Sequence, residues 1–219
     1  MALRPPPRRR SETPRITVIG LAGGVGAGKS TVAAILASLG CLVLDADAQV
    51  RALLDTPEVR DQLVGWWGGS ILGGDGMVDR KAVAAIVFAG PEQLRRLESL
   101  LHPRVIQAQR EAIEGADPKV TPAVVLDVPL LFEAGMDSAC DAVIFVDTPE
   151  PLRLARVRSS RGWDEAELAR RQASQWPMET KKAKSSFVVM NAGDRTDLEE
   201  QVREAFEQIR PDPEPEPRS

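Results

Sequence analysis

A glycine-rich segment at residues 23–31 carries the residue types that bind phosphate groups. Its sequence, Gly-Gly-Val-Gly-Ala-Gly-Lys-Ser-Thr, matches the pattern G-x-x-x-x-G-K-[S/T]. Glycines let backbone N–H groups wrap around an oxyanion without steric clash from a Cβ atom. Lys29 has the length to reach the β- and γ-phosphates, and the Ser30 hydroxyl is suited to holding Mg²⁺. The segment predicts binding of a nucleoside triphosphate through Gly24, Gly26, Ala27, Gly28, Lys29, Ser30 and Thr31.

The residues on both sides of this loop predict the elements that must position it. Residues 16–21 are apolar and partly β-branched, which is typical of a buried strand. Residues 31–40 are rich in alanine and leucine and end in Gly40, which suits the end of a helix. A strand, a glycine-rich loop and a helix in this order place the bound anion at the helix N-terminus.

Three aspartates follow predicted strands and are candidates for chemistry. Asp45 and Asp47 come after a short strand at residues 41–44, and carboxylates beside a phosphate loop can hold Mg²⁺ or orient an attacking hydroxyl. Because Asp is also a favoured helix N-cap, we expect one of the two to be structural and Asp47 to be the catalyst. Asp127 lies in an apolar strand at residues 123–128 and is expected either to contact Mg²⁺ or to cap the strand end.

The remaining pattern predicts an α/β fold of the P-loop type. Strands at the positions already given, and further strands at residues 142–147 and 187–190, alternate with helical stretches, which predicts a parallel five-stranded sheet flanked by helices. A helical insert at about residues 55–118 includes helices expected at 79–89, 91–101 and 103–115. An arginine-rich helical lid is expected at about residues 150–185, and a last helix at about 196–209. In open α/β sheets ligands bind at the carboxyl ends of the strands, which both helical segments are placed to cover.

The composition is that of an ordinary globular protein with one domain at residues 15–210. The chain has 219 residues, of which 43% are hydrophobic and 27% charged, and its net charge of −4 argues against a dedicated nucleic-acid binder. No apolar run approaches the length of a membrane span. The two cysteines, Cys41 and Cys140, favour a reduced, cytoplasmic protein. The proline-rich ends, residues 1–14 and 211–219, are expected to be disordered.

Several ordered motifs together resemble one enzyme family. They are the loop at 23–31, Leu-Asp-Ala-Asp at 44–47, Leu-Leu-His-Pro at 100–103, Asp-Val-Pro-Leu-Leu-Phe-Glu at 127–133 and Asn-Ala-Gly at 191–193. The chain is similar to dephospho-coenzyme A kinase from about residue 15 to residue 205. The resemblance implies phosphorylation of the ribose 3′-hydroxyl of dephospho-CoA by ATP with Mg²⁺, the last step of coenzyme A synthesis. It also implies a nucleotide-binding core, a helical CoA-binding part and a mobile lid.

The same resemblance assigns roles to single residues. Asp47 is implied as the base or orienting group for the ribose hydroxyl, and Arg156 as an active-site arginine of the lid. Arg161 is implied as a second lid arginine that contacts ATP. His102, the only histidine, is implied to lie near the acceptor; its position between two predicted helices also fits a structural role.

Three further positions match the family with less specific roles. Asp45 and Gln175 are expected to contact the substrate, and Asn191 to contact ATP. The small molecules ATP and dephospho-CoA are the expected partners, with no nucleic acid and no membrane, and we expect a monomer or a weak homo-oligomer. The chain departs from the family pattern where Ser186 and Met190 replace acidic residues around the last strand.

Two other classes of protein remain open at this stage. A nucleoside monophosphate kinase, or another small-molecule kinase, would share the loop and the sheet. A GTPase switch would also share the loop, but the chain has no Asn-Lys-x-Asp segment for reading guanine. The long helical insert and the Leu-His-Pro element favour a CoA-like acceptor.

Overall fold

The computed structural model describes residues 15–210, and both terminal segments that were predicted to be disordered lie outside the described residues. The described chain divides into two compact units. We call the residues up to Leu44 and from Ala116 the sheet unit, and residues Asp45–Gly115 the helical unit.

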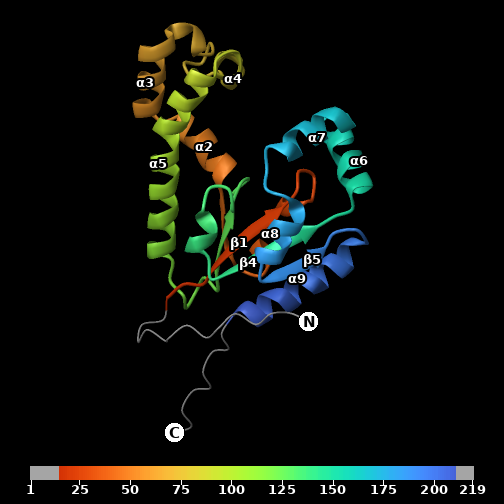
Figure 1. Ribbon diagram of the computed structural model, residues 1–219. Coiled ribbons are helices and arrows are strands. Elements are labelled where there is room, and N and C mark those ends of the chain that lie inside the picture. Colours follow the sequence, from red (N-terminus) through yellow and green to blue (C-terminus); the bar gives the residue numbers. More distant parts are fainter. Residues whose placement is uncertain (1–14, 211–219) are drawn as a thin grey trace. The chain divides into compact units, whose positions relative to one another are not determined.

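The sheet unit contains the strands and six of the helical elements. They are β1 (Val18–Gly23), α1 (Lys29–Ser38), β2 (Leu42–Asp45, which ends at the boundary), β3 (Val124–Asp127), η2 (Met136–Ala139), β4 (Ala142–Asp147), α6 (Glu150–Arg161), α7 (Glu165–Ala173), α8 (Met178–Lys184), β5 (Phe187–Met190) and α9 (Arg195–Ile209) (Figure 1). The helical unit contains α2 (Ala46–Leu54), α3 (Pro57–Trp67), η1 (Gly69–Ile71), α4 (Arg80–Ala89) and α5 (Pro91–Gly115). No helix within residues 15–210 has both the length and the apolar character needed to span a membrane.

The predicted parallel five-stranded sheet is confirmed, with the order β2-β3-β1-β4-β5. The central strand β1 pairs in parallel with β3 and β4, and Gly20 lies opposite both Leu126 and Val143. Strand β1 extends further than predicted, to Gly23, and leads directly into the glycine-rich loop. Because all paired strands run the same way, their carboxyl ends meet at the edge of the sheet where that loop begins.

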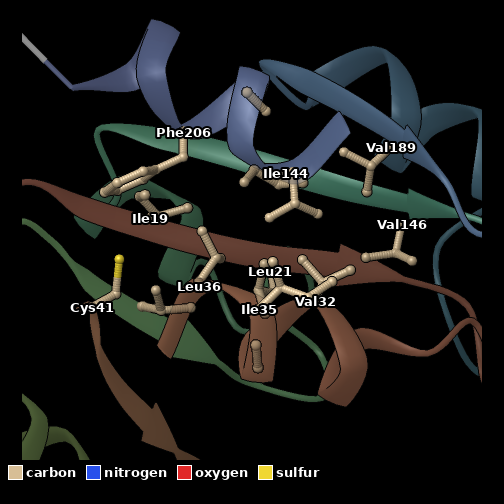
Figure 2. Packing of buried hydrophobic residues seen from close by; sticks show 14 of the residues in the cluster. Ile19, Leu21, Val32, Ile35, Leu36, Cys41, Ile144, Val146, Val189 and Phe206 are labelled. Carbon is tan, nitrogen blue, oxygen red and sulfur yellow. The ribbon is translucent and has the colours of Figure 1, made fainter. Parts of the chain in front are cut away.

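One face of the sheet packs against α1 and α9 through a continuous apolar core (Figure 2). Ile19 and Leu21 of β1 point into this core, where Leu36 of α1 and Phe206 of α9 meet them. Residues alternate between faces along a strand, so Gly20 points to the opposite face. A Cβ atom at Gly20 would lie 2.7 Å from Leu131 Cδ2, which explains why a glycine occupies this position.

The helical unit departs from the prediction at its longest helix. Helices expected at 91–101 and 103–115 form one helix, α5, with Pro103 inside it. Proline removes one backbone hydrogen bond and costs about 3 kcal/mol in a helix interior. Leu101 and Val105 are buried on either side of it, and burying each side chain contributes about 1.5–3 kcal/mol. The Arg104 guanidinium also donates to the Leu100 carbonyl at 2.9 Å, so the helix continues through the proline.

Both cysteines are buried in the sheet unit as free thiols. Burial raises the pKa of Cys41 to about 11, although Arg210 works against the change. Burial raises the pKa of Cys140 to about 12, and the nearby carboxylates of Asp137 and Asp141 add to the shift. The thiolate is the reactive form of cysteine, so both side chains are expected to be inert in the folded protein.

This predicts slow reaction of both thiols with an aromatic disulfide reagent at pH 8. We expect the folded protein to react at least about 100-fold more slowly than the same protein in urea, where the thiol pKa returns to its ordinary range. Release of the coloured thiol, followed by absorbance, measures both rates. Rapid labelling of one equivalent of thiol in the folded state would contradict the burial of that cysteine.

Candidate active site

The glycine-rich loop leaves β1 at Gly23 and enters α1 at Lys29. Gly26 and Gly28 have φ angles of +76° and +88°, in the left-handed region that favours glycine. The Ala27 N–H donates to the Gly24 carbonyl at 3.1 Å and closes a turn inside the loop. Ser30 and Thr31 lie in the first turn of α1, where backbone N–H groups have no acceptor four residues earlier in the helix. Such a helix start can bind an anion.

The Ala27 carbonyl accepts three hydrogen bonds from side chains of three other segments. Thr148 Oγ1 donates at 2.9 Å, Asn191 Nδ2 at 2.8 Å and Arg156 Nη1 at 3.2 Å. Thr148 follows β4, Arg156 lies in α6 and Asn191 follows β5. Thr148 and Asn191 are buried, so this carbonyl points into the protein. The loop is therefore held by α6 and by the residues that directly follow β4 and β5.

Arg156 and Asn191 also bind each other. Arg156 Nη2 donates at 3.1 Å to both the backbone carbonyl and the side-chain oxygen of Asn191. Asn191 lies so close to the loop that a Cβ atom at Gly28 would be 2.2 Å from its Nδ2 atom. Both residues were predicted as site residues from the resemblance, and the structure brings both against the loop backbone. Their contacts with ATP stay predictions.

Arg153 is a residue that the sequence analysis missed. Its side chain is buried, although an arginine is rarely fully buried and an arginine-rich helix usually presents its arginines to solvent. Nε donates to the Thr148 carbonyl at 3.1 Å and Nη1 donates to Gln172 Oε1 at 2.8 Å. A Cβ atom at Gly26 would lie 2.9 Å from the Arg153 carbonyl oxygen. This arginine differs from its exposed neighbours only in its tertiary contacts, so the sequence contains no signal that predicts its burial.

Arg161, predicted to contact ATP, is exposed at the end of α6. Its guanidinium lies 4.8 Å from the ring centre of Trp163, and the Arg171 guanidinium lies 4.0 Å from the same ring. These cation–π contacts join the end of α6 to α7. The phosphate contact of Arg161 stays a prediction.

Helix α8 lies against the loop and the ends of two strands. It packs on β1 and β4, and a Cβ atom at Gly24 would lie 2.9 Å from Met178 Cε. Lys182 Nζ binds Asp147 Oδ2, at the end of β4, at 2.5 Å. The hydrogen bond to Asp147 raises the pKa of Lys182 above its ordinary value. Helix α8 is therefore a second part of the lid segment, besides α6, that contacts the glycine loop.

A second lysine of α8 is buried in a polar cluster. Lys181 Nζ binds Glu133 Oε1 at 2.7 Å and Gln175 Oε1 at 3.0 Å. Gln175 was predicted to contact the substrate, and in the structure its side-chain oxygen accepts from Lys181 instead. Its substrate contact stays a prediction.

One carboxylate oxygen of Glu133 accepts two hydrogen bonds. Its Oε1 atom also accepts from the Trp176 backbone N–H at 2.8 Å, and the rings of Phe132 and Trp176 stack with centres 6.2 Å apart. Burial acts to raise the pKa of the Glu133 carboxyl, but hydrogen bonds from Lys181 and Trp176 outweigh it and hold the pKa below its ordinary value. The carboxylate is therefore ionised at neutral pH.

Asp127 ends β3, the strand beside β1, and is half-buried. Its carboxylate and the Ser30 hydroxyl are oxygen donors of the kind that Mg²⁺ prefers. Within residues 15–210 no group of three or more His, Cys, Asp or Glu side chains is gathered to hold a metal ion. The donor set therefore fits a Mg²⁺ ion held mainly by phosphate oxygens and water, with one or two protein ligands.

The helical unit carries the two predicted acceptor-side carboxylates. Asp45 is the N-cap of α2, and its Oδ1 accepts from the Ala48 N–H at 2.9 Å, so the structural alternative holds for this aspartate. Asp47 lies exposed in the first turn of the same helix. His102 is exposed inside α5, and the prediction that it lies between two helices is wrong. The substrate contacts of all three stay predictions.

Comparison with known proteins identifies close relatives over most of the chain. The family model of dephospho-CoA kinase matches residues 17–197. The chain is 41% identical over 192 residues to the dephospho-CoA kinase of Deinococcus radiodurans, and the match covers 87% of this chain and 91% of that protein. The solved structure of TT1252 from Thermus thermophilus is 33% identical, with a TM-score of 0.74 over 89% of this chain and 98% of that one. Dephospho-CoA kinase from Campylobacter jejuni is 24% identical and shares the fold, with a TM-score of 0.67 over 89% and 97% of the two chains.

The low pKa of Glu133 predicts a pH-dependent contribution to stability. A carboxyl whose pKa is lowered by folding stabilises the protein above its ordinary pKa of 4.5, and this stabilisation is lost as the pH falls through the folded-state value. Glu133→Gln resembles the protonated side chain, so its deficit relative to wild type should be present at pH 7 and shrink below pH 4.5. Urea unfolding of both proteins from pH 7 to pH 3 measures this, and a constant deficit would contradict it.

Proposed function

Since this chain belongs to the dephospho-CoA kinase family, we propose that it transfers the γ-phosphoryl group of ATP to the ribose 3′-hydroxyl of dephospho-CoA, giving coenzyme A and ADP. The observation that carries this proposal is the family match over residues 17–197 together with the geometry of the glycine loop. The family match does not favour the alternative of a nucleoside monophosphate kinase. The roles of single residues rest on the family resemblance and, for the residues around the loop, also on their contacts.

The glycine loop is proposed to bind the β- and γ-phosphates. Its left-handed glycines and the first turn of α1 offer backbone N–H donors, and Lys29 adds a positive charge at the start of the helix. The three side-chain donors on the Ala27 carbonyl support this conformation of the loop. A support that is in place before the substrate binds reduces the reorganisation needed in the transition state.

Ser30 and Asp127 are the residues that would hold Mg²⁺. When bound, the Mg²⁺ ion would neutralise negative charge on the transferring phosphoryl group. Lys29 acts on the same charge, so loss of its ammonium group is expected to be severe. No histidine or cysteine is required for such an oxygen-bound ion.

Asp47 is proposed to accept the hydrogen bond of the attacking hydroxyl and to orient it. Its carboxylate is exposed, whereas that of Asp45 is engaged in capping α2. A carboxylate of this kind acts as a base or an orienting group in phosphoryl transfer. His102, also exposed in the helical unit, is proposed to contact the acceptor.

Arg156 and Arg161 are proposed to stabilise the charge on the transferring group when the lid segment closes. Arg156 presents its planar guanidinium beside the loop, where Ala27 and Asn191 orient it. A guanidinium has five N–H donors, so one that is anchored by part of its edge can still donate to phosphate. Closure over the site excludes water and so limits hydrolysis of ATP.

The finer expectations on ligands and setting are part of the same proposal. ATP and dephospho-CoA are the small-molecule substrates, with Asn191 on the ATP side and Asp45 and Gln175 on the acceptor side. We also propose that the protein works in the cytoplasm, with reduced cysteines, as a monomer or a weak homo-oligomer.

A direct assay tests the activity. Incubation with ATP, Mg²⁺ and dephospho-CoA should add one phosphoryl group to dephospho-CoA, detected by mass spectrometry, while AMP, CMP and shikimate should remain unmodified. Lys29→Ala should lower kcat by at least about 1000-fold, because the ammonium group that stabilises the negative charge of the transferring phosphoryl group is lost. Phosphorylation of AMP or CMP in preference to dephospho-CoA would refute the proposed acceptor, and wild-type activity in Lys29→Ala would refute the proposed loop.

The proposed role of Asp47 predicts that its substitution lowers kcat but hardly changes the KM for ATP. Asp47→Asn should lower kcat by about 100-fold or more and change the KM for ATP by less than about threefold, since the lost interaction concerns the acceptor hydroxyl in the transition state. Asp61→Asn is the matched control, because Asp61 is an exposed carboxylate of α3 in the same unit whose partner is the neighbouring Arg60. If Asp47→Asn keeps the kcat of this control, Asp47 is not the orienting group.

A further inference from the structure

A buried ion pair joins helix α8 to the segment that follows β3, and we propose that it makes Lys181 a positioning residue for phosphoryl transfer. Lys181 Nζ lies 2.7 Å from Glu133 Oε1 and 3.0 Å from Gln175 Oε1. The pair lies outside every role assigned above. This role concerns the proposed kinase activity and therefore rests on that proposed function.

Most of this pair is withdrawn from water, which makes it a poor source of stability. The side chain of Lys181 is 3% exposed and that of Glu133 is 15% exposed. Glu133 Oε2 is buried and has no hydrogen-bond partner within the described residues. Removing two charges from water is costly, and well-packed neutral residues in place of a buried ion pair are often equally stable. The pair is therefore better explained by the geometry that it imposes than by the stability that it supplies.

The Glu133 end of the pair fixes the segment that begins at the proposed metal ligand. Asp127 ends β3, and the chain reaches Glu133 six residues later. Within this segment Leu131 and Phe132 are buried, and Leu131 packs over Gly20 of β1. Glu133 is therefore linked to Asp127 by a short segment that is anchored next to Glu133 by the buried Leu131 and Phe132.

The Lys181 end of the pair fixes α8 against the glycine loop. Met178, in the first turn of α8, lies against Gly24. Lys181 also holds Gln175, and Glu133 holds the backbone N–H of Trp176, so the connection between α7 and α8 is bound to the same two charges. The ion pair thus ties α8, which lies against the glycine loop, to the segment that follows β3.

The adjacent Lys182 forms a second ion pair of α8, which is more exposed to solvent than the pair of Lys181 and Glu133. Its side chain is 37% exposed, and its partner Asp147 lies at the end of β4. Exposed pairs of this kind contribute little because water and salt screen them. The two lysines attach α8 to segments at the ends of two different strands, but only the Lys181 contact is withdrawn from solvent.

The test separates positioning from stability with a single and a double variant. Lys181→Met leaves the Glu133 carboxylate buried without a cation, so its Tm should fall by about 10 °C. Lys181→Met/Glu133→Gln removes both charges and keeps an oxygen that can accept from Trp176, so most of the lost Tm should return. If the ion pair positions the segments around the site, the kcat of the double variant stays about tenfold or more below that of wild type, measured at a temperature far below the Tm of the variant.

A neutralised surface pair is the matched control. Arg195→Met/Glu199→Gln removes an exposed ion pair of α9 and should leave both Tm and kcat unchanged. A double variant at residues 181 and 133 with kcat within about twofold of wild type would show that the pair is merely structural, and would overturn the inference. If wild type itself does not phosphorylate dephospho-CoA in the same assay, the proposed function fails instead. Should the single variant not fold, the double variant decides the question alone.

Discussion

The geometry of this site depends on a single backbone carbonyl, that of Ala27. A loop that offers its N–H groups to an anion must turn its carbonyl groups elsewhere, and a buried carbonyl without a donor is costly. Here Thr148, Arg156 and Asn191 supply the donors: Thr148 directly follows β4, Arg156 lies in α6 and Asn191 directly follows β5. The conformation of the loop is therefore coupled to segments more than a hundred residues away in the chain.

Two buried polar side chains hold the lid segment together internally. Arg153 and Lys181 are each almost fully buried, and each bonds to a glutamine of the same segment, Gln172 and Gln175 respectively. Buried polar groups are stable only when their hydrogen bonds are satisfied, so they allow few alternative arrangements. Such contacts suit a segment that must be placed accurately.

The sequence predicted the sheet more reliably than it predicted the site. The five strands follow from short apolar runs bounded by helical patterns, and the loop follows from glycine spacing. The single helix α5 was missed because Pro103 is a strong local signal for a break, and local signals cannot weigh the burial of Leu101 and Val105 on either side. The burial of Arg153 was missed because an arginine-rich segment predicts a solvated face.

The sequence by itself determined the class of fold, the phosphate-binding loop and the family resemblance, because each depends on residue types at short, regular spacing. The tertiary structure decided which polar residues support the loop. Asn191 and Arg156 meet Ala27 only because the carboxyl ends of parallel strands converge, and Lys181 meets Glu133 only because α8 packs across β1 and β4. These contacts join residues far apart in the chain, and their strength comes from burial, which the folded chain alone creates.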